Sequence, residues 1–392
     1  MNDRTVEHGW LSALTQLPTA AGREGRVSRW VEAWARERAG VLLRRDGAGN
    51  IELRLAGSEA LAPPIYFTAH MDHPAFVVDE VLADGRVALE FRGGVMADYF
   101  HDARVRLHPA SGPPVGARLV ASVASPKALH LAQPDAPASG LAVGDVATWE
   151  LPEARIEDGL IHTHACDDLA ALAAALAALD RLRRARAAGA PERQDVRVLL
   201  TRAEEIGFVG AIAACRDGTM PPGSRVLALE NSRALPESPV GGGPIVRVGD
   251  RLSVFSPTLS AAVAQRAEEA FGGPATPTAA QKASAGAARR WQRKLMAGGA
   301  CEATVFCDYG YEATCLCLPL GNYHNMADLA AVQAGTNTTP ARVGPEFVSI
   351  ADFDGLVDLL VACGERLPAA PGARAMIDRL WSQKQGVLSE PA

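Results

Sequence analysis

The sequence predicts an α/β protein in which a mainly parallel sheet is flanked by helices and interrupted by an inserted all-β domain. Helical and strand patterns alternate along residues 161–392, and such alternation is typical of a parallel sheet covered by helices. Within residues 75–160, short β-rich segments alternate with Gly, Pro and Asp turns, and no long helical pattern occurs. We therefore expect one α/β domain, formed by residues 1–74 and 161–392, with a β-rich domain inserted at 75–160.

Length, charge and hydropathy restrict the class of protein. The 392 residues are enough for two or three domains, and the net charge of −6 gives no general attraction to nucleic acid or to an anionic membrane. No apolar run reaches the roughly 18 residues of a membrane-spanning helix, and the N-terminus lacks the apolar core of a signal peptide. The seven cysteines are odd in number, which indicates buried thiols rather than a disulfide framework. We expect a cytoplasmic protein without nucleic-acid or membrane partners.

The N-terminal part supplies the first helix and strands. Residues 24–38 carry four large apolar side chains at helical spacing and predict an amphipathic helix. An Asp-Gly-Ala-Gly-Asn turn at 46–50 joins two short strands, and an apolar strand follows at 65–70. Polar side chains follow at the C-terminal end of this last strand. In open α/β sheets, active sites lie at this end of the strands.

The later elements follow from the same patterns. Short strands are predicted at 76–78, 86–89 and 118–121 in the β-rich part, and then helices at 169–187, 209–215 and 258–270 alternate with strands at 196–200 and 226–229. Residues 273–290, rich in Gly, Ala and Pro, are predicted as a flexible loop. Cys315 and Cys317 fit a buried strand better than a thiolate metal site, because no second cysteine pair stands at a suitable spacing.

Five short groups of acids and histidines stand where predicted strands end or just before a helix. They are His70-Met71-Asp72, Asp167-Asp168, Glu204-Glu205, Glu230-Asn231 and His324-Asn325. Taken singly, each group is a weak signal, since an acid at such a place is often a helix cap or a surface charge. Taken together, two histidines, three acids and a spare carboxylate are the inventory of a two-metal hydrolytic site.

That inventory matches a known chemistry. Imidazole and carboxylate ligands suit Zn²⁺, Co²⁺ or Mn²⁺. One carboxylate can bridge two ions about 3.5–4 Å apart, and a water between them then ionises near neutral pH. A neighbouring carboxylate that is not a ligand can accept the proton of this water. Two adjacent acids in one loop can therefore supply both a metal ligand and the proton acceptor.

In these groups, in their order and in the β-rich insertion, the chain resembles the M42 glutamyl aminopeptidase family of two-metal peptidases, whose wider clan includes the M28 and M20 peptidases. The resemblance extends through most of the chain. It includes the segments Asp46-Gly47-Ala48-Gly49-Asn50, His70-Met71-Asp72, Gly144-Asp145, Asp167-Asp168, Glu204-Glu205-x-Gly207, Gly241-Gly242-Gly243-Pro244-Ile245 and the late His324. It implies a zinc-exopeptidase-like fold for the α/β domain.

The resemblance implies a set of metal ligands. His70 and His324 would each bind one ion, and Asp167 would bridge the two. Glu205 and Glu230 would complete the two coordination spheres. We expect two divalent ions per subunit, with zinc as the first expectation and cobalt or manganese as alternatives.

The resemblance also implies roles beside the ions. Glu204 would be the general base, which takes a proton from the water and passes it to the leaving amine. Asp72 would hold the imidazole of His70 in one tautomer. Asp168 fits an N-cap of the following helix better than a ligand, because the bridging position falls on Asp167.

Departures from the family pattern concern the expected pocket. Glu230 stands where M42 members usually have Asp, a change that can shift metal geometry or preference. The usual Asp-Glu-Ile-Gly-Phe is Asp72-His73-Pro74-Ala75-Phe76 here, and the usual Gly-Thr-Asp-Ala is Gly299-Ala300-Cys301-Glu302-Ala303. His73 fits a surface or loop role better than a site role. Glu302 fits two roles equally, a partner for the amino group of a substrate or for a nearby arginine.

We expect a metal-dependent aminopeptidase that removes N-terminal residues from peptides. The resemblance also implies homo-oligomers, from dimers up to dodecamers, assembled through the inserted domain. One alternative is a metal-dependent amidohydrolase or deacylase that acts on a small acylated amino acid. The other is a catalytically silent assembly protein, which the competent residues at all six expected positions disfavour.

Overall fold

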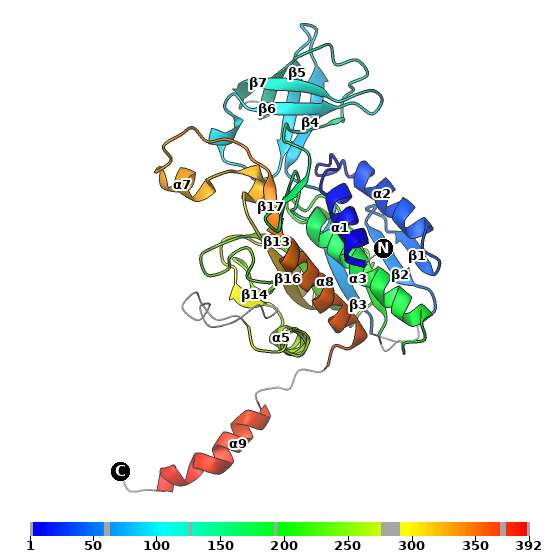
Figure 1. Cartoon of the computed structure of the whole chain (residues 1–392), viewed down its shortest axis with the longest axis vertical. Helices are drawn as coiled ribbons and strands as arrows, with labels where there is room; N and C mark the ends of the chain where they lie inside the picture. The colour runs from blue at the N-terminus through cyan, green and yellow to red at the C-terminus, as the bar shows by residue number, and fades with distance from the viewer. Residues whose placement is uncertain are drawn as a thin grey trace.

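The computed structural model describes residues 3–58, 63–124, 128–191, 194–275, 291–368 and 374–389. The molecule has three parts along its longest axis: a small barrel at the top of the view, an α/β body in the middle, and a helix that stands apart near the C-terminus (Figure 1). The prediction of an α/β fold is confirmed.

An eight-stranded sheet forms the centre of the body. Its strands, in spatial order, are β1 (Val41–Arg45), β2 (Ile51–Leu55), β12 (Val196–Thr201), β3 (Ile65–His70), β13 (Arg225–Arg233), β16 (Glu312–Leu320), β14 (Ile245–Gly249) and β15 (Gln292–Leu295). Among these described strands, four of the seven neighbouring pairs are parallel, namely β12–β3, β3–β13, β13–β16 and β14–β15. The adjacent strands β12, β3, β13 and β16 therefore all point the same way, so that their C-terminal ends meet at one edge of the sheet.

Helices cover both faces of this sheet. One face packs against α1 (Asp3–Leu14), α2 (Gly25–Arg36), α3 (Leu169–Ala187), α5 (Pro257–Phe271) and α8 (Ile350–Glu365). The other face packs against α4 (Val209–Arg216) and α6 (Glu302–Asp308). β3 is buried along its whole length, which is why it reads as an unbroken apolar run rather than an alternating one. The small alanines of α3 let it lie close to β3, α1 and α8.

A closed six-stranded barrel follows β3. Its strands are β4 (Ala75–Val81), β5 (Val87–Arg92), β8 (Leu129–Pro134), β7 (Val115–Val123), β6 (Arg104–His108) and β9 (Val146–Trp149), and a short 3-10 helix, η1 (Ala97–Phe100), lies between β5 and β6. Aromatic rings fill its interior: the centroids of Phe76 and Trp149 are 4.8 Å apart, and those of Phe91 and Phe100 are 4.9 Å apart. Closure of the barrel removes exposed strand edges.

A second, three-stranded sheet connects the barrel to the body. It consists of β10 (Arg155–Glu157), β11 (Leu160–Thr163) and β17 (Glu346–Ser349). The pairing of β11 with β17 places Thr163 opposite Glu346 and so brings the segment before α3 next to a late part of the chain. The remaining elements are η3 (Tyr323–Asn325), α7 (Leu329–Ala334), α9 (Arg374–Lys384) and η4 (Gln385–Ser389). Most of the predicted loop at 273–290, from residue 276 on, lies outside the described residues.

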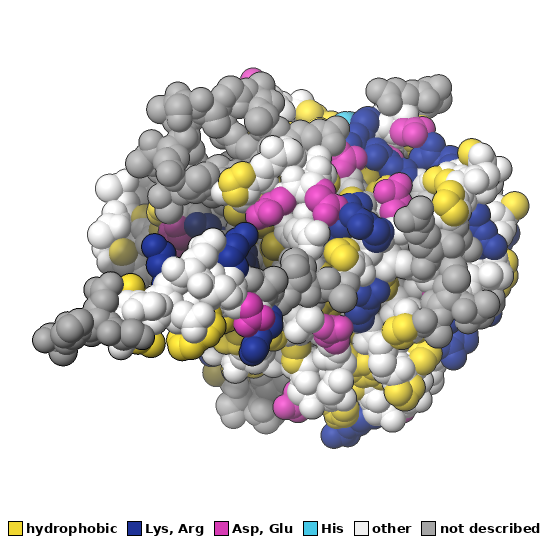
Figure 2. Space-filling view, turned by 90° about the horizontal axis from the view of Figure 1, so that it is seen from below, with side chains coloured by type: hydrophobic (Ala, Val, Ile, Leu, Met, Phe, Trp, Pro, Cys, Tyr) yellow, Lys and Arg dark blue, Asp and Glu magenta, His cyan; other side chains and the backbone are white. Residues whose placement is uncertain are grey.

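The surface of the described residues carries mixed charge. Figure 2, a view from below, shows basic and acidic side chains interspersed over this face rather than separated by sign. No helix in the described part of the chain has the length and apolar character needed to cross a membrane. All seven cysteines are described, and none forms a disulfide.

Candidate metal centre

The five side chains proposed as metal ligands meet at the C-terminal edge of the parallel strands. His70 is the last residue of β3, and Glu230 lies on the neighbouring β13. Glu205 follows β12, Asp167 precedes α3, and His324 lies in η3 after β16. The structure thus gathers five residues that are spread over more than 250 positions of the sequence. All five side chains are buried.

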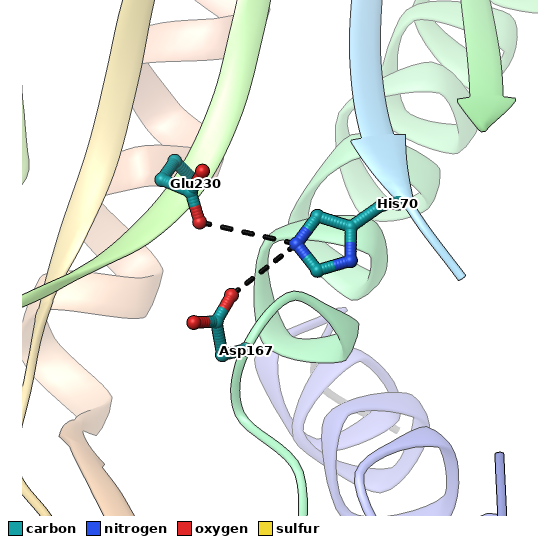
Figure 3. A group of neighbouring side chains, drawn as sticks. All are labelled: His70, Asp167 and Glu230. Carbon is teal, nitrogen blue, oxygen red and sulfur yellow. Dashed lines mark ion pairs between the residues drawn. The ribbon is translucent and has the colours of Figure 1, made fainter. Parts of the chain in front are cut away.

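These side chains form two groups that share Asp167. In the first, Nε2 of His70 lies 3.3 Å from Oδ1 of Asp167 and 3.9 Å from Oε1 of Glu230 (Figure 3). In the second, Nε2 of His324 lies 3.4 Å from Oδ2 of Asp167 and 3.5 Å from Oε2 of Glu205. In each group, one ligand atom per residue falls within 4.8 Å of the others, a spacing that suits a metal ion. The two oxygens of Asp167 therefore face two different groups.

The buried carboxylates of these two groups need compensating positive charge. Burial raises the pKa of Glu205 and, to a smaller extent, that of Glu230, and neighbouring carboxylates add to both shifts. Oδ1 of Asp167 and Oε1 of Glu205 are buried without a hydrogen-bond partner among the described residues. Because an uncompensated buried carboxylate is costly, the residues present fit divalent cations. Two imidazoles and three carboxylates are also the donor set that zinc, cobalt and manganese accept.

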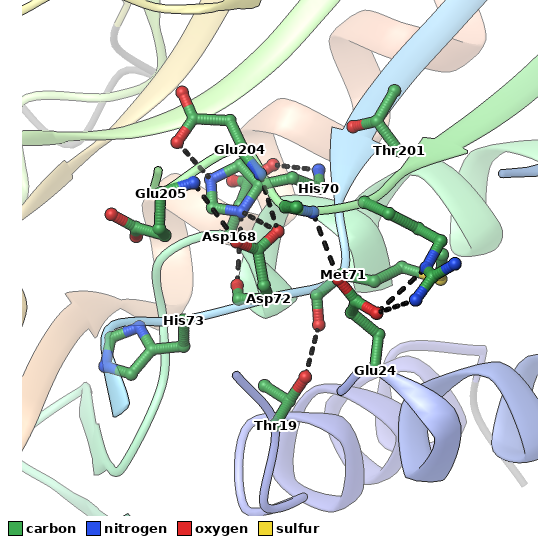
Figure 4. Close-up of polar contacts among 12 residues, drawn as sticks. Thr19, Glu24, His70, Met71, Asp72, His73, Asp168, Thr201, Glu204 and Glu205 are labelled. Atoms are coloured by element: carbon green, nitrogen blue, oxygen red, sulfur yellow. Dashed lines mark hydrogen bonds and ion pairs between the residues drawn. The ribbon is translucent and has the colours of Figure 1, made fainter. Parts of the chain in front are cut away.

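Glu204 lies beside the first group. Its side chain is buried, and its Oε2 is 4.0 Å from Nε2 of His70. The carboxylate of Asp72 accepts hydrogen bonds from the backbone N–H groups of Glu204 and Glu205, at 3.0 and 3.1 Å (Figure 4). Burial raises the pKa of Glu204 well above its ordinary value, and the charge of Glu230 adds to this shift. Glu204 also forms a third possible ligand group with His70 and Glu205.

Asp72 also contacts His70. Its Oδ1 lies 3.6 Å from Nδ1 of His70, and its backbone carbonyl oxygen lies closer, at 3.1 Å. Both oxygens face the ring nitrogen that points away from the ligand groups. A hydrogen bond from Nδ1 to either oxygen would leave Nε2 of His70 free for a metal ion.

A residue that the sequence analysis did not identify constrains the loop with the two glutamates. Oε1 of Glu24, just before α2, accepts a hydrogen bond from the backbone N–H of Ala203, and Oε2 accepts one from the guanidinium of Arg202 (Figure 4). Ala203 has a φ of +53°, which is unfavourable for a residue other than glycine. Glu24 therefore stabilises the turn that presents Glu204 and Glu205.

Asp168 occupies the N-cap position of α3, as predicted, but its side chain accepts no hydrogen bond from the helix. Its Oδ2 instead accepts a hydrogen bond from the backbone N–H of His70 (3.3 Å), and its Oδ1 accepts one from the side-chain amide of Asn231 (2.7 Å). Asp168 thus connects β3 and β13, the two strands that carry His70 and Glu230.

The prediction of a surface or loop role for His73 is wrong about the surface. His73 lies in the loop between β3 and β4, but its side chain is fully buried there. Its Nδ1 lies 2.5 Å from the backbone carbonyl oxygen of Asp167, and its Nε2 lies 3.0 Å from Oδ1 of Asn325. The amide of Asn325 donates to the backbone carbonyl oxygen of His164. His73 therefore contacts the backbone of one proposed ligand, Asp167, and the side chain of Asn325, which is the neighbour of another, His324.

Glu346 is a further residue that the sequence analysis missed. Its Oε2 accepts hydrogen bonds from the backbone N–H groups of Cys166 (2.7 Å) and Asp167 (3.0 Å), and its Oε1 accepts one from that of His324 (2.8 Å). This fully buried carboxylate fixes two ligand segments that are distant in sequence. Its position at the start of β17 gives no local signal, because its partners depend on the pairing of β17 with β11.

A cavity of about 250 Å³ opens beside these groups. Asp167, Glu204, Glu205, Glu230 and His324 line it, together with residues that include Arg233, Arg247, Met296, Tyr323 and Leu329. The arrangement, a cavity with buried imidazoles and carboxylates on one wall, is that of a metal-dependent hydrolase.

Glu302, at the start of α6, is buried close to these groups. Neither of its carboxylate oxygens has a hydrogen-bond partner among the described residues, and burial raises its pKa to about 7. An ion pair between Glu302 and an arginine is absent from the described part of the chain. Glu302 is not among the residues that line the cavity.

Comparison with known proteins defines the family. A model of the M42 glutamyl aminopeptidase family matches residues 49–134 and 128–271, which together span more than half of the chain. The chain therefore belongs to the M42 glutamyl aminopeptidase family, as its resemblance predicted, and it is a metal-dependent aminopeptidase. A search of curated proteins found no match.

Solved structures share the fold. A TET aminopeptidase from the marine sediment archaeon Thaumarchaeota archaeon SCGC AB-539-E09 aligns with a TM-score of 0.71 at 18% identity, covering 93% of this chain and 97% of that one. The aminopeptidase APDkam598 of the archaeon Desulfurococcus kamchatkensis aligns with a TM-score of 0.70 at 20% identity, covering 92% of this chain and 95% of that one. The TET1 peptidase of Pyrococcus horikoshii aligns with a TM-score of 0.70 at 19% identity, covering 92% of this chain and 100% of that one. Nearly the whole of each relative is thus represented in this chain.

Substitution of Glu346 tests whether its carboxylate organises the metal ligands. Glu346→Ala leaves three buried N–H groups without their acceptor, at a cost of about 1–3 kcal/mol each. We expect metal affinity to fall roughly 10–100-fold, as is usual when a residue that orients ligands is lost. Glu346→Gln, which keeps one acceptor oxygen, should lose less. Elemental analysis after dialysis against graded chelator measures the effect, and the exposed Glu153→Ala serves as control. Unchanged affinity in Glu346→Ala would contradict this role.

Proposed function

We propose that this aminopeptidase hydrolyses the first peptide bond of peptides with a free N-terminus, at a centre of two divalent ions held by His70, Asp167, Glu205, Glu230 and His324. The observation that carries the proposal is the pair of buried ligand groups that share Asp167 beside the cavity. A carboxylate that faces two groups through its two oxygens suits a bridge between two ions.

The ions are proposed to be zinc, with cobalt or manganese as alternatives, because the ligands are imidazoles and carboxylates without thiolates. When bound, two such cations polarise a carbonyl group and lower the pKa of a water molecule. Asp72 is proposed to keep Nε2 of His70 free for a cation by accepting the hydrogen of Nδ1.

Glu204 is proposed as the general base. Its carboxylate lines the cavity and adjoins the first ligand group, so that it can accept a proton from the attacking water. Because burial raises its pKa, the protonated form is stable enough to hold that proton until the leaving amine accepts it. Glu205, its neighbour, lies with the second ligand group instead.

A peptide with a free amino group suits this site electrostatically. Glu302 is proposed to face the α-ammonium group, since both of its buried oxygens lack a partner in the described chain. A deacylase would instead have to accept a neutral, acylated nitrogen next to these carboxylates. The family of the chain and the charge of the site therefore both favour the aminopeptidase over the deacylase.

Assembly into homo-oligomers, from dimers up to dodecamers, is proposed because similar proteins form such assemblies. The TET1 peptidase of Pyrococcus horikoshii assembles into a tetrahedron or a large octahedral shell, and a related TET1 structure contains a dodecamer. We propose that residues 75–160, which include the barrel, form a separate domain with a role in this assembly. A reducing cytoplasm is the proposed location, supported by seven cysteines without disulfides.

A mixed pool of short peptides, half with free and half with acetylated N-termini, tests the proposed reaction. Mass spectrometry with added Zn²⁺ or Co²⁺ should reveal stepwise shortening of the free peptides only, because the acetylated ends lack the ammonium group. A chelator should abolish this shortening. Release of acyl groups while free peptides stay intact would favour the deacylase, and no cleavage with either metal would favour the silent assembly protein.

Glu204→Gln tests the general base. Gln has nearly the same shape but cannot accept the proton, so kcat should fall by about 10²–10⁴-fold while metal content stays unchanged. The exposed Glu153→Gln is the matched control and should retain full activity. Activity near that of the unmodified enzyme would refute the assignment of Glu204. A loss of metal in Glu204→Gln would instead assign Glu204 to the third ligand group.

A further inference from the structure

The helix α9 near the C-terminus has an apolar face that no other part of the described chain covers. Met376, Ile377, Leu380 and Trp381 follow one another at helical spacing, and Val387 and Leu388 of η4 extend the series. These six side chains are between 48% and 78% exposed. Figure 1 shows that α9 stands clear of the body, and in Figure 2 hydrophobic side chains lie along one side of the projecting arm.

Such a helix needs a partner surface. α9 has only 11 residues, and isolated helices shorter than about 12–15 residues are marginal in water. Among the described residues, the hydrogen bonds of its side chains, from Arg374 to Asp378 and from Ser382 to the carbonyl oxygen of Asp378, stay within the helix. Most of the stability of an amphipathic helix comes from packing of its apolar face.

The same chain carries a largely apolar groove in the α/β body, between the end of β2, α3, the start of β12 and the end of α8; we call it the foot groove. Its apolar lining residues include Leu55, Leu182, Ala185, Pro191 and Val196. Arg186, Gln194, Arg266 and the end of α8 at residues 364–366 complete the lining. The opening has a volume of about 290 Å³, which is enough for a large apolar side chain. The groove therefore offers the kind of surface that the apolar face of α9 lacks.

The link between groove and helix favours exchange between two copies. The chain is anchored as far as Leu367, whose backbone N–H donates to Gln194, a residue of the groove. Six residues then lead to α9, and two of them are prolines. Linkers that contain proline act as spacers, and six residues span at most about 20 Å. α9 stands clear of the body in Figure 1, as an arm that reaches a second molecule does.

We propose that α9 is an exchange arm, whose apolar face binds in the foot groove of a second copy of this chain. In a twofold pair each copy gives one helix and receives one, so that the contact is made twice and both apolar surfaces are covered. The proposal rests on the homo-oligomer of the proposed function and adds a contact between copies that lies far from the barrel.

Photo-cross-linking of the full-length protein tests the exchange. With Trp381 replaced by benzoylphenylalanine, irradiation should give a denaturing-gel band of twice the chain mass, cross-linked to peptides within residues 182–196. Leu380→Asp combined with Trp381→Asp should shift the assembly to a smaller mass in sedimentation and leave peptide hydrolysis unchanged. The matched control on the polar face is Arg379→Asp combined with Ser382→Asp, which should keep the larger mass.

Each other outcome would overturn the exchange arm. Cross-links to residues 182–196 within a band of single-chain mass would mean that α9 folds back onto its own groove. Cross-links between two α9 helices would mean that the helices pair with each other. An unchanged assembly mass in the Leu380→Asp, Trp381→Asp protein would refute the arm but leave assembly through residues 75–160 standing. A monomeric unmodified protein would refute both.

Discussion

The position of Asp167 is the constraint on which the rest of this structure depends. Its two oxygens face two imidazoles from opposite parts of the chain, at 3.3 and 3.4 Å. Burial alone would raise the pKa of Asp167, but the nearby imidazoles of His324 and His70 lower it and so favour the charged carboxylate. A charged carboxylate at this depth needs compensating positive charge, and the surrounding acids increase that need. The α/β sheet provides the geometry, because parallel strands deliver their C-terminal residues to one edge.

Around the proposed metal centre, several carboxylates bind backbone N–H groups and are not themselves among the five proposed ligands. Glu346 fixes the segments of Asp167 and His324, and Asp72 fixes those of Glu204 and Glu205. Each of these acids is buried, and each joins elements that are distant in sequence. Hydrogen bonds between carboxylates and backbone amides are charge-assisted and strong, so they hold the segments of the proposed ligands in place. Removal of such an acid is therefore expected to affect the proposed metal centre without changing a proposed ligand.

The sequence predicted the parts of this arrangement that have local signals. The helix predicted at 169–187 coincides with α3, and the strand predicted at 65–70 coincides with β3. The histidines and acids were selected because they stand at the ends of predicted strands. The structure brings these same residues together at the proposed metal centre. Glu346 and His73 could not be assigned in this way, because their partners depend on tertiary contacts: Glu346 is 180 residues from Cys166, and His73 is 94 from Asp167. The N-cap position of Asp168 could be predicted because it is local, whereas its bond to Asn231 is not local and could not.

Anomalous X-ray diffraction from crystals grown with Zn²⁺, recorded on both sides of the zinc absorption edge, is the most direct test of the central claim. We expect two anomalous peaks per subunit, about 3.5–4 Å apart, with one oxygen of Asp167 next to each. His70 and Glu230 should lie at one peak, and His324 and Glu205 at the other. A single peak, or two peaks of which Asp167 touches only one, would contradict the bridging role and with it the proposed two-ion centre.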